Sequence, residues 1–173
     1  ELIAGIAAQV PRPTETFLLT ALTEAAAIAE QQRRCGTTAL QLVDHVPAAE
    51  LRQLRDLLPD VRLVQVVHVR GWESIEEARA VAPLVDTILL DSGNPGLTIK
   101  ELGGTGRVHD WNHSRRIVES VRVPVLLAGG LNPDNARAAA GQVRPAGLDV
   151  CSGLRTDGRL DAGKLKAFFA AIH

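Results

Sequence analysis

The stretch Val125-Leu-Leu-Ala-Gly-Gly-Leu-Asn-Pro-Asp-Asn135 decides how this 173-residue chain is expected to fold. The apolar residues Val125–Ala128 have the composition of a strand that is buried on both faces of a sheet. Two glycines follow, and Asn132-Pro133-Asp134 then places a capping residue before a first-turn proline, which is typical of a helix start. A buried strand, a glycine turn and a helix in such close succession predict one unit of a parallel α/β sheet.

Strand-like and helix-like segments alternate along the rest of the chain. The other strand candidates are short and rich in Val, Leu and Ile, and they are Thr16–Thr20, Ala39–Val43, Leu63–Val69, Thr87–Asp91 and Leu148–Cys151. The helix candidates have apolar residues at helical spacing, and they are Leu22–Arg34, Ala48–Leu58, Ser74–Ala82, Asn112–Ser120, Pro133–Ala140 and Ala162–Ile172. Consecutive strand–helix pairs with short connections imply right-handed crossovers and a parallel sheet.

Two architectures have this order of elements, an open doubly wound sheet and a closed (β/α)8 TIM barrel. The segment Glu1–Val10 has helical spacing and no capping residue before it, so the chain is expected to begin inside a helix. Two further strand–helix units ahead of it would complete a (β/α)8 barrel of about 200 or more residues. We therefore expect residues 1–173 to be a single α/β barrel domain, truncated at its N-terminus, in which about six strand–helix units are present.

The composition narrows the class of protein. Apolar residues make up 46% and charged residues 23%, which is typical of a soluble globular domain. The net charge of −1 gives no electrostatic reason to expect a nucleic-acid partner. The apolar runs are too short for a membrane span, and Glu1-Leu-Ile-Ala-Gly5 does not resemble a signal peptide. Cys35 and Cys151 are expected to be reduced, with Cys151 buried, in a cytoplasmic protein without a zinc site.

The candidate functional residues follow the last three strands, because a parallel barrel builds its active site at the carboxyl ends of its strands. Asp91 ends one strand, Gly129-Gly130 follow the next, and Cys151-Ser152-Gly153 end the last. Glycine turns and helix N-termini at these places commonly hold phosphate through backbone N–H groups. A phosphorylated small molecule is the ligand class that this pattern predicts.

Two acids are candidates for chemistry. Asp91 closes an apolar strand, and a carboxyl group that is partly removed from water can keep its proton near neutral pH and act as a general acid. The alternative is that Asp91 caps a turn or pairs with a nearby Lys or Arg. Asp149 is expected to lie within a strand and to be buried, where it either binds substrate hydroxyls or pairs with a neighbour.

A glycine-rich segment, Glu101-Leu-Gly-Gly-Thr-Gly-Arg-Val-His-Asp-Trp111, lies between Asp91 and the next helix. Such a segment is either an anion-binding loop or a mobile connection. His68 is interpreted as a hydrogen-bonded core histidine, and Trp72 and Trp111 as residues that pack helix starts onto the barrel.

Four motifs together resemble the phosphoribosylanthranilate isomerase family of tryptophan biosynthesis. They are Leu89-Leu-Asp91, Gly103-Gly-Thr-Gly106 with Asp110-Trp111, Leu127-Ala-Gly-Gly-Leu-Asn-Pro-Asp-Asn135 and Val143-Arg-Pro-Ala-Gly-Leu-Asp-Val-Cys-Ser-Gly153. The resemblance implies an aldose–ketose isomerase, an intramolecular oxidoreductase, that catalyses the Amadori rearrangement of N-(5-phosphoribosyl)anthranilate to the carboxyphenylamino-deoxyribulose phosphate. It implies no cofactor and no metal, a small phosphorylated sugar-anthranilate as partner, and a monomer or homodimer.

The resemblance also implies a role for each matching residue. By position, Asp91 matches the general acid and Asp149 the acid near the substrate hydroxyls. The residues that match the phosphate-binding turns are Gly129, Gly130, Cys151, Ser152 and Gly153. The flexible loop that covers the site is matched by Gly103, Gly104, Thr105 and Gly106.

The sequence departs from the family pattern in one important place. The family's general base is a cysteine in a Lys-x-Cys-Gly motif on the first strand, and this sequence has no such motif. Cys35-Gly36 follows a helix end and is not equivalent, while Cys151 stands where serine is usual. If the first strand is truly absent, the alternative is a catalytically impaired phosphosugar-binding or assembly protein. A related ribose-phosphate isomerase of histidine biosynthesis fits the motifs less well.

Overall fold

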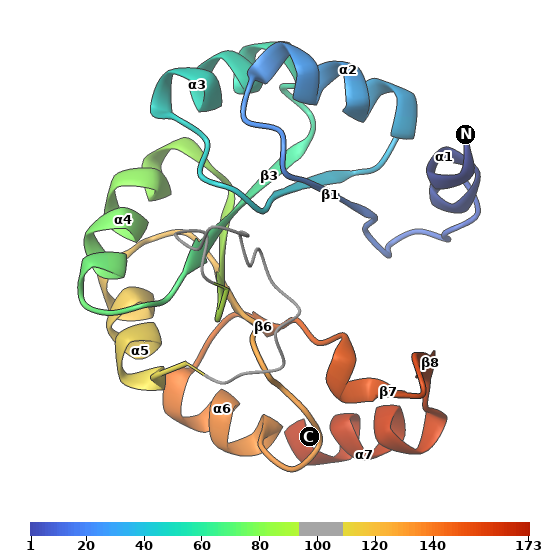
Figure 1. The fold of residues 1–173 in the computed structure, drawn as a ribbon, viewed down its shortest axis with the longest axis vertical. Coiled ribbons are helices and arrows are strands. Elements are labelled where there is room, and N and C mark those ends of the chain that lie inside the picture. Colours follow the sequence, from blue (N-terminus) through green and yellow to red (C-terminus); the bar gives the residue numbers. More distant parts are fainter. Residues whose placement is uncertain (94–108) are drawn as a thin grey trace.

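The computed structural model describes residues 1–93 and 109–173. Parallel strands form one curved six-stranded sheet in the order β1-β2-β3-β4-β5-β6, so each strand pairs with its neighbour in the sequence. The helices lie on the outer side of this sheet, with α1 and α7 at the two ends of the arrangement (Figure 1). This is the architecture of a (β/α)8-type barrel of which the chain supplies six strand–helix units, as the sequence predicts.

The elements have the following bounds. The strands of the sheet are β1 (Phe17–Thr20), β2 (Ala39–Leu42), β3 (Arg62–His68), β4 (Thr87–Asp91), β5 (Val125–Leu127) and β6 (Gly147–Leu148). The helices are α1 (Leu2–Ala7), α2 (Ala25–Cys35), α3 (Ala48–Leu57), α4 (Glu73–Val81), α5 (Trp111–Ser120), α6 (Ala136–Val143) and α7 (Ala162–Ile172). Short 3-10 turns η1 (Ala82–Leu84) and η2 (Ser152–Leu154) and the hairpin β7 (Arg155–Thr156) and β8 (Arg159–Leu160) complete the described chain.

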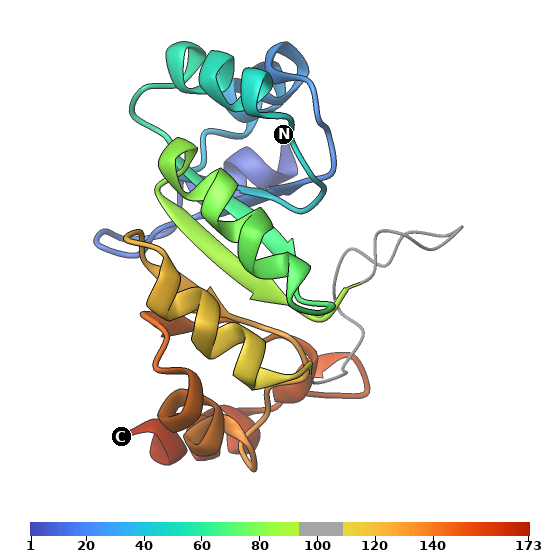
Figure 2. The ribbon, with the colours of Figure 1, turned by 90° about the vertical axis from the view of Figure 1, so that its left-hand side faces the viewer.

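Apolar residues fill both faces of the sheet. The larger cluster lies between sheet and helices and includes Ile28, Leu54 and Ile117. A smaller cluster of buried residues fills the inner face, and its members are Val64, Val66, Leu89 and Ala128. Neighbouring helices such as α4 and α5 lie side by side over the outer face (Figure 2). The expectation of strands buried on both sides is therefore confirmed for β3 and β4, whereas β1 carries the exposed Leu19 and β6 is only half-buried.

The pairing of the strands brings the expected site residues to one edge. His68 lies opposite Asp91 in the β3–β4 register. The backbone N–H of Ala128 donates to the Leu90 carbonyl (2.7 Å), and that of Asp149 donates to the Leu127 carbonyl (2.8 Å). The carboxyl ends of β4, β5 and β6 are therefore in line, and the segments that follow them meet at this edge.

The last strand is shorter than the sequence predicts. Its ladder with β5 ends at Leu148, because the backbone then turns into η2. Asp149 and Cys151 consequently lie beyond the strand, and both are exposed. The expectations that Asp149 sits within a strand and is buried, and that Cys151 is buried, are wrong.

The start of α6 also differs from the expectation. The Asn132 side-chain oxygen accepts hydrogen bonds from the backbone N–H groups of Asp134 (2.9 Å) and Asn135 (3.3 Å). These bonds fold Asn132–Asn135 into a turn, so the helix begins at Ala136 and Pro133 lies before it. Asn132 is a turn former rather than the cap of a helix at Pro133.

The two tryptophans behave differently. Trp111 is half-buried and packs against the main core at the start of α5, as expected. Trp72 is 61% exposed, so the prediction that it packs a helix start onto the barrel is wrong. Its ring instead forms a T-shaped contact with the His113 ring, with centroids 4.5 Å apart. Within the described ranges, no helix combines the length and the hydropathy that crossing a membrane requires.

Candidate active site

Asp91 ends β4 at the edge where the three strands finish, and it is only 9% exposed. Its Oδ1 accepts a hydrogen bond from the backbone N–H of Ser92 (2.7 Å). The turn-capping alternative is therefore confirmed in part, because one oxygen of the Asp91 carboxylate accepts a hydrogen bond from the next residue of the chain. Within residues 1–93 and 109–173, Asp91 forms no ion pair, and the pairing alternative finds no partner there. A carboxyl group in this position is placed to exchange a proton with a ligand at the mouth of the barrel.

Asp149 lies across the strand ends from Asp91. Although its side chain is exposed, the surrounding protein atoms remove part of its solvation, and this desolvation raises the pKa of Asp149. The negative charge of Asp91 raises it further. The two carboxyl groups are therefore electrostatically coupled, although Asp91 ends β4 and Asp149 lies just beyond the end of β6. Acids that interact in this way are common where proton transfer or hydroxyl binding takes place.

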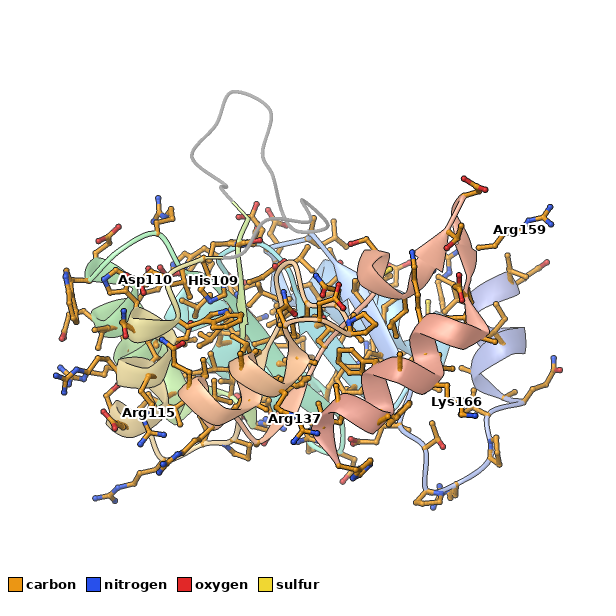
Figure 3. The ribbon with its side chains drawn as sticks, turned by 90° about the horizontal axis from the view of Figure 1, so that it is seen from below. His109, Asp110, Arg115, Arg137, Arg159 and Lys166 are labelled. Carbon is orange, nitrogen blue, oxygen red and sulfur yellow. The ribbon has the colours of Figure 1, made fainter. Side chains whose placement is uncertain are left out.

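His109 is a third titratable group of the site, and sequence reasoning did not select it. It precedes α5 on the side of the strand ends (Figure 3). Its Nε2 lies 2.6 Å from the Ser114 hydroxyl oxygen, and its Nδ1 is buried without a partner among the described residues. Burial lowers the pKa of His109 from 6.5 to about 4, against the opposing effects of the Asp91 and Asp110 charges. The imidazole is therefore neutral at physiological pH.

The glycine turn after β5 has the backbone conformation that its sequence indicates. Gly129 and Gly130 have φ angles of +86° and +64°, both in the left-handed region that favours glycine. The Gly130 carbonyl accepts hydrogen bonds from the side-chain amides of Asn132 (3.3 Å) and Asn135 (3.0 Å). Asn132 and Asn135 therefore hold the turn in one conformation. A turn held in this way can bind an anion through its backbone N–H groups.

The segment after β6 packs directly on that turn. Ser152 is exposed and Gly153 is half-buried, and both belong to η2. A Cβ atom added to Gly153 would lie 1.9 Å from the carbonyl oxygen of Leu131. The structure therefore brings together the two predicted phosphate-binding segments, Gly129–Gly130 and Cys151–Gly153, next to the two acids.

Two other expectations concern the surroundings of the site. His68 is a hydrogen-bonded core histidine, as expected, because it is 5% exposed and its Nε2 lies 3.0 Å from the Val43 carbonyl oxygen. The predicted covering loop, Gly103, Gly104, Thr105 and Gly106, lies outside the described residues. No group of three or more His, Cys, Asp or Glu side chains suited to a metal ion is found in the described ranges.

The fold and the site define a class of protein, a parallel barrel of (β/α)8 type with acids and glycine turns at the carboxyl ends of its strands. Residues 22–171 match the family model of N-(5'-phosphoribosyl)anthranilate (PRA) isomerase. The chain belongs to this family.

A named relative supports the assignment. An N-(5'-phosphoribosyl)anthranilate isomerase from Methanocella arvoryzae is 40% identical over 132 residues, which are 76% of this chain and 60% of that protein. The chain thus spans about 60% of the length of this relative.

Solved structures show the same fold. The phosphoribosyl anthranilate isomerase from Thermotoga maritima superposes with a TM-score of 0.81 at 26% identity, covering 98% of this chain and 78% of that one. Another, in complex with reduced 1-(o-carboxyphenylamino)-1-deoxyribulose 5-phosphate, gives a TM-score of 0.78 at 23% identity, covering 98% of this chain and 77% of that one.

Proposed function

We propose that the protein catalyses the Amadori rearrangement of N-(5'-phosphoribosyl)anthranilate, the aldose–ketose isomerisation for which its relatives are named. The observation that carries the proposal is the position of Asp91. It is a buried acid at the end of β4, adjacent to two glycine turns that pack on one another. An acid beside an anion-binding backbone suits a phosphorylated sugar whose ring must be opened.

The proposed chemistry begins with ring opening. Asp91 donates its proton to the ring oxygen of the ribose, the bond from that oxygen to C1 breaks, and the nitrogen lone pair forms the C1=N bond of an iminium ion. A base then removes the proton from C2, and the electrons of that C–H bond form the C1=C2 bond of an enolamine. A proton then returns to C1 while the C2 hydroxyl gives up its proton to the solvent, and the electrons of that O–H bond form the C2=O bond of the ketone product. The sequence has no Lys-x-Cys-Gly motif, so we assign no residue to the base.

The other site residues bind and orient the substrate in this proposal. The backbone of Gly129, Gly130, Cys151, Ser152 and Gly153 holds the phosphate. Cys151 is compatible with this role despite its exposed side chain, because the contact is made by main-chain N–H groups. Asp149 binds sugar hydroxyls, and Gly103–Gly106 cover the site and exclude water.

We further propose a cytoplasmic protein that acts as a monomer or homodimer and does not bind nucleic acid. The net charge of −1 and the sequence's lack of a basic aromatic stripe support the last of these, the absence of nucleic-acid binding. The alternative expected from the sequence is a catalytically impaired phosphosugar-binding or assembly protein, and the relatives, which are named as isomerases, do not favour it.

Two measurements on the same preparation separate these functions. Titration with reduced 1-(o-carboxyphenylamino)-1-deoxyribulose 5-phosphate reports binding, and the loss of N-(5'-phosphoribosyl)anthranilate over time reports turnover. Saturable binding together with turnover is the result we expect. Binding without turnover would favour the alternative, and failure to bind the analogue would exclude both. Gly129→Ala is expected to weaken binding of the analogue, because alanine strains a φ of +86° and would place its Cβ 3.0 Å from the Ser92 hydroxyl oxygen.

A further inference from the structure

His68 is a buried histidine beside Asp91 that the proposed chemistry does not use. It is the last residue of β3, and it is the register partner of Asp91, the last residue of β4. The backbone N–H of Val69 donates to the Asp91 carbonyl (2.9 Å), so the two strands are still hydrogen-bonded at this level. His68 and Asp91 are therefore direct neighbours on adjacent strands.

The side chains of both residues belong to the inner face of the sheet. Successive side chains of a strand point to opposite faces, so residues two positions apart share a face. Val66 and Leu89, two positions before His68 and Asp91, belong to the inner apolar cluster. The intervening residue of each strand belongs to the outer cluster. His68 and Asp91 thus form a polar layer above the apolar inner cluster, at the end of the barrel where parallel barrels bind their ligands.

Only one ring nitrogen of His68 has a partner among the described residues. Nε2 lies 3.0 Å from the carbonyl oxygen of Val43, the residue after β2. A carbonyl oxygen can only accept a hydrogen bond, so Nε2 carries the proton. Nδ1 is buried and has no partner in the described part of the chain. A second proton on Nδ1 would be buried without an acceptor, and Nδ1 therefore presents a lone pair.

A buried acceptor without a partner is uncommon in folded proteins, because it has given up its hydrogen bond to water. A lone pair attracts O–H and N–H donors, whereas phosphate and carboxylate groups offer it only further lone pairs. The groups of a phosphorylated sugar that suit it are the hydroxyls. Asp91 is almost as enclosed as His68, with exposed fractions of 9% and 5%. A ligand that reaches the Asp91 carboxyl group therefore reaches the neighbouring His68 ring as well.

We propose that His68 is a substrate-binding residue: its ring is held by the Val43 carbonyl, and its Nδ1 accepts a hydrogen bond from a sugar hydroxyl of the substrate beside Asp91. This inference rests on the function proposed above and extends it. The sugar is held by Asp149 beyond β6 and by His68 at the end of β3. A hydrogen bond of fixed direction from β3 orients the sugar ring against the acid that opens it.

Nitrogen NMR of the histidine rings tests the proposed hydrogen bond without requiring turnover. The signals of His68 are assigned from their loss in His68→Gln. In the unliganded protein they should be those of a neutral ring with its proton on Nε2. Saturation with reduced 1-(o-carboxyphenylamino)-1-deoxyribulose 5-phosphate should move the Nδ1 signal upfield, as a hydrogen bond to a ring lone pair does, and leave Nε2 nearly unchanged. An unchanged Nδ1 signal in the saturated protein would overturn the inference.

Inorganic phosphate is the control ligand for this titration. It is expected to occupy the glycine turns without bringing a sugar hydroxyl to β3, so the Nδ1 signal of His68 should stay in place. If phosphate alone moved that signal as far as the analogue does, His68 would respond to the anion instead of the sugar, and the inference would be wrong.

Two substitutions separate the two ring nitrogens of His68. The amide nitrogen of glutamine can take the place of Nε2, and the amide oxygen of asparagine can take the place of Nδ1. His68→Gln should keep the bond to the Val43 carbonyl and most of the stability, yet bind the analogue about three- to tenfold more weakly, the effect of one lost hydrogen bond. His68→Asn should unfold at a lower urea concentration than His68→Gln but bind the analogue more tightly than that variant.

A purely structural role for His68 predicts the opposite order of affinities, because the less stable His68→Asn would then bind more weakly. That order, or wild-type affinity in both variants, would contradict the inference. His45→Gln is the matched control. The His45 side chain is 69% exposed, and its substitution should change neither the urea midpoint nor the affinity for the analogue appreciably.

The outcomes for His68 and for the proposed function can be told apart. Turnover together with an unchanged Nδ1 signal would overturn only the role of His68. A shifted Nδ1 signal without turnover would support that role and count against the isomerase. Failure of the wild-type protein to bind the analogue would overturn both.

Discussion

Gly153 and Leu131 approach so closely that a Cβ on Gly153 would lie 1.9 Å from the Leu131 carbonyl oxygen. This contact joins the segment after β6 to the glycine turn after β5, and it involves backbone atoms that cannot rotate away. We expect Gly153→Ala to destabilise the protein by about 3 kcal/mol, at the upper end of overpacking effects, and to weaken binding of the product analogue. Urea unfolding and analogue titration measure the two effects.

Gly141→Ala is the matched control for that variant. Gly141 lies in α6, and a Cβ there would meet no atom within 4 Å. The substitution should stabilise the protein by about 0.5–1 kcal/mol, because alanine restricts the unfolded chain and favours the helix. If Gly153→Ala were tolerated as well as Gly141→Ala, the close packing of the two site segments would be refuted.

The stability of the protein should depend on pH through His109. In the unfolded chain His109 takes up a proton near pH 6.5, whereas in the folded protein its pKa is about 4. Between these values the unfolded state binds more protons, so the free energy of unfolding falls as the pH is lowered. The loss attributable to His109 is at most about 3 kcal/mol.

His109→Phe removes that contribution. We expect the difference in unfolding free energy between the wild type and His109→Phe to be constant above pH 7 and to shift in favour of the variant between pH 6.5 and 4. Urea unfolding at a series of pH values measures it. Parallel curves for the two proteins across this range would show that His109 is not held neutral by the fold.

Asp149 should affect stability in the opposite sense to an ion-paired acid. Its raised pKa means that the folded protein binds this proton more tightly than the unfolded chain, so stability is lost as the pH rises through the folded pKa. At neutral pH Asp149→Asn should therefore raise the unfolding free energy, by less than about 1 kcal/mol because solvent screens an exposed side chain. It should also weaken analogue binding.

The control for Asp149→Asn is Asp134→Asn, which removes an exposed charge of the same sign from the turn before α6. Urea midpoints and analogue affinities are compared at pH 7. If Asp149→Asn were less stable than the wild type, the fold would be stabilising the charged Asp149 carboxylate instead of destabilising it.

The parts of the fold that follow from local pattern were predictable. The strand Thr87–Asp91 and the helix Ala162–Ile172 have the predicted bounds, because continuous apolar runs and helical spacing are visible in the sequence. The exposure of Asp149 and Cys151 was not predictable in the same way. It depends on how long β6 remains paired with β5, which is set by the turn into η2 rather than by residue type.

In the candidate site, too, some residues could be predicted from the sequence and others could not. Asp91 and the two glycine turns stand out because the carboxyl ends of parallel strands are recognisable from strand order. His109 was missed because its burial arises from Ser114 and from the fold around Asp91, neither of which is apparent from sequence spacing. Its position within the glycine-rich segment, directly before Asp110-Trp111, was the available signal.

Turnover of N-(5'-phosphoribosyl)anthranilate by the wild type and by Asp91→Asn decides whether Asp91 is the general acid of an isomerase. We expect turnover by the wild type and a kcat lower by about 100-fold or more in the variant, since a positioned proton donor typically contributes that much. Binding of the product analogue should be largely retained by Asp91→Asn, which controls for loss of folding. Near wild-type turnover by the variant would show that Asp91 is not the general acid.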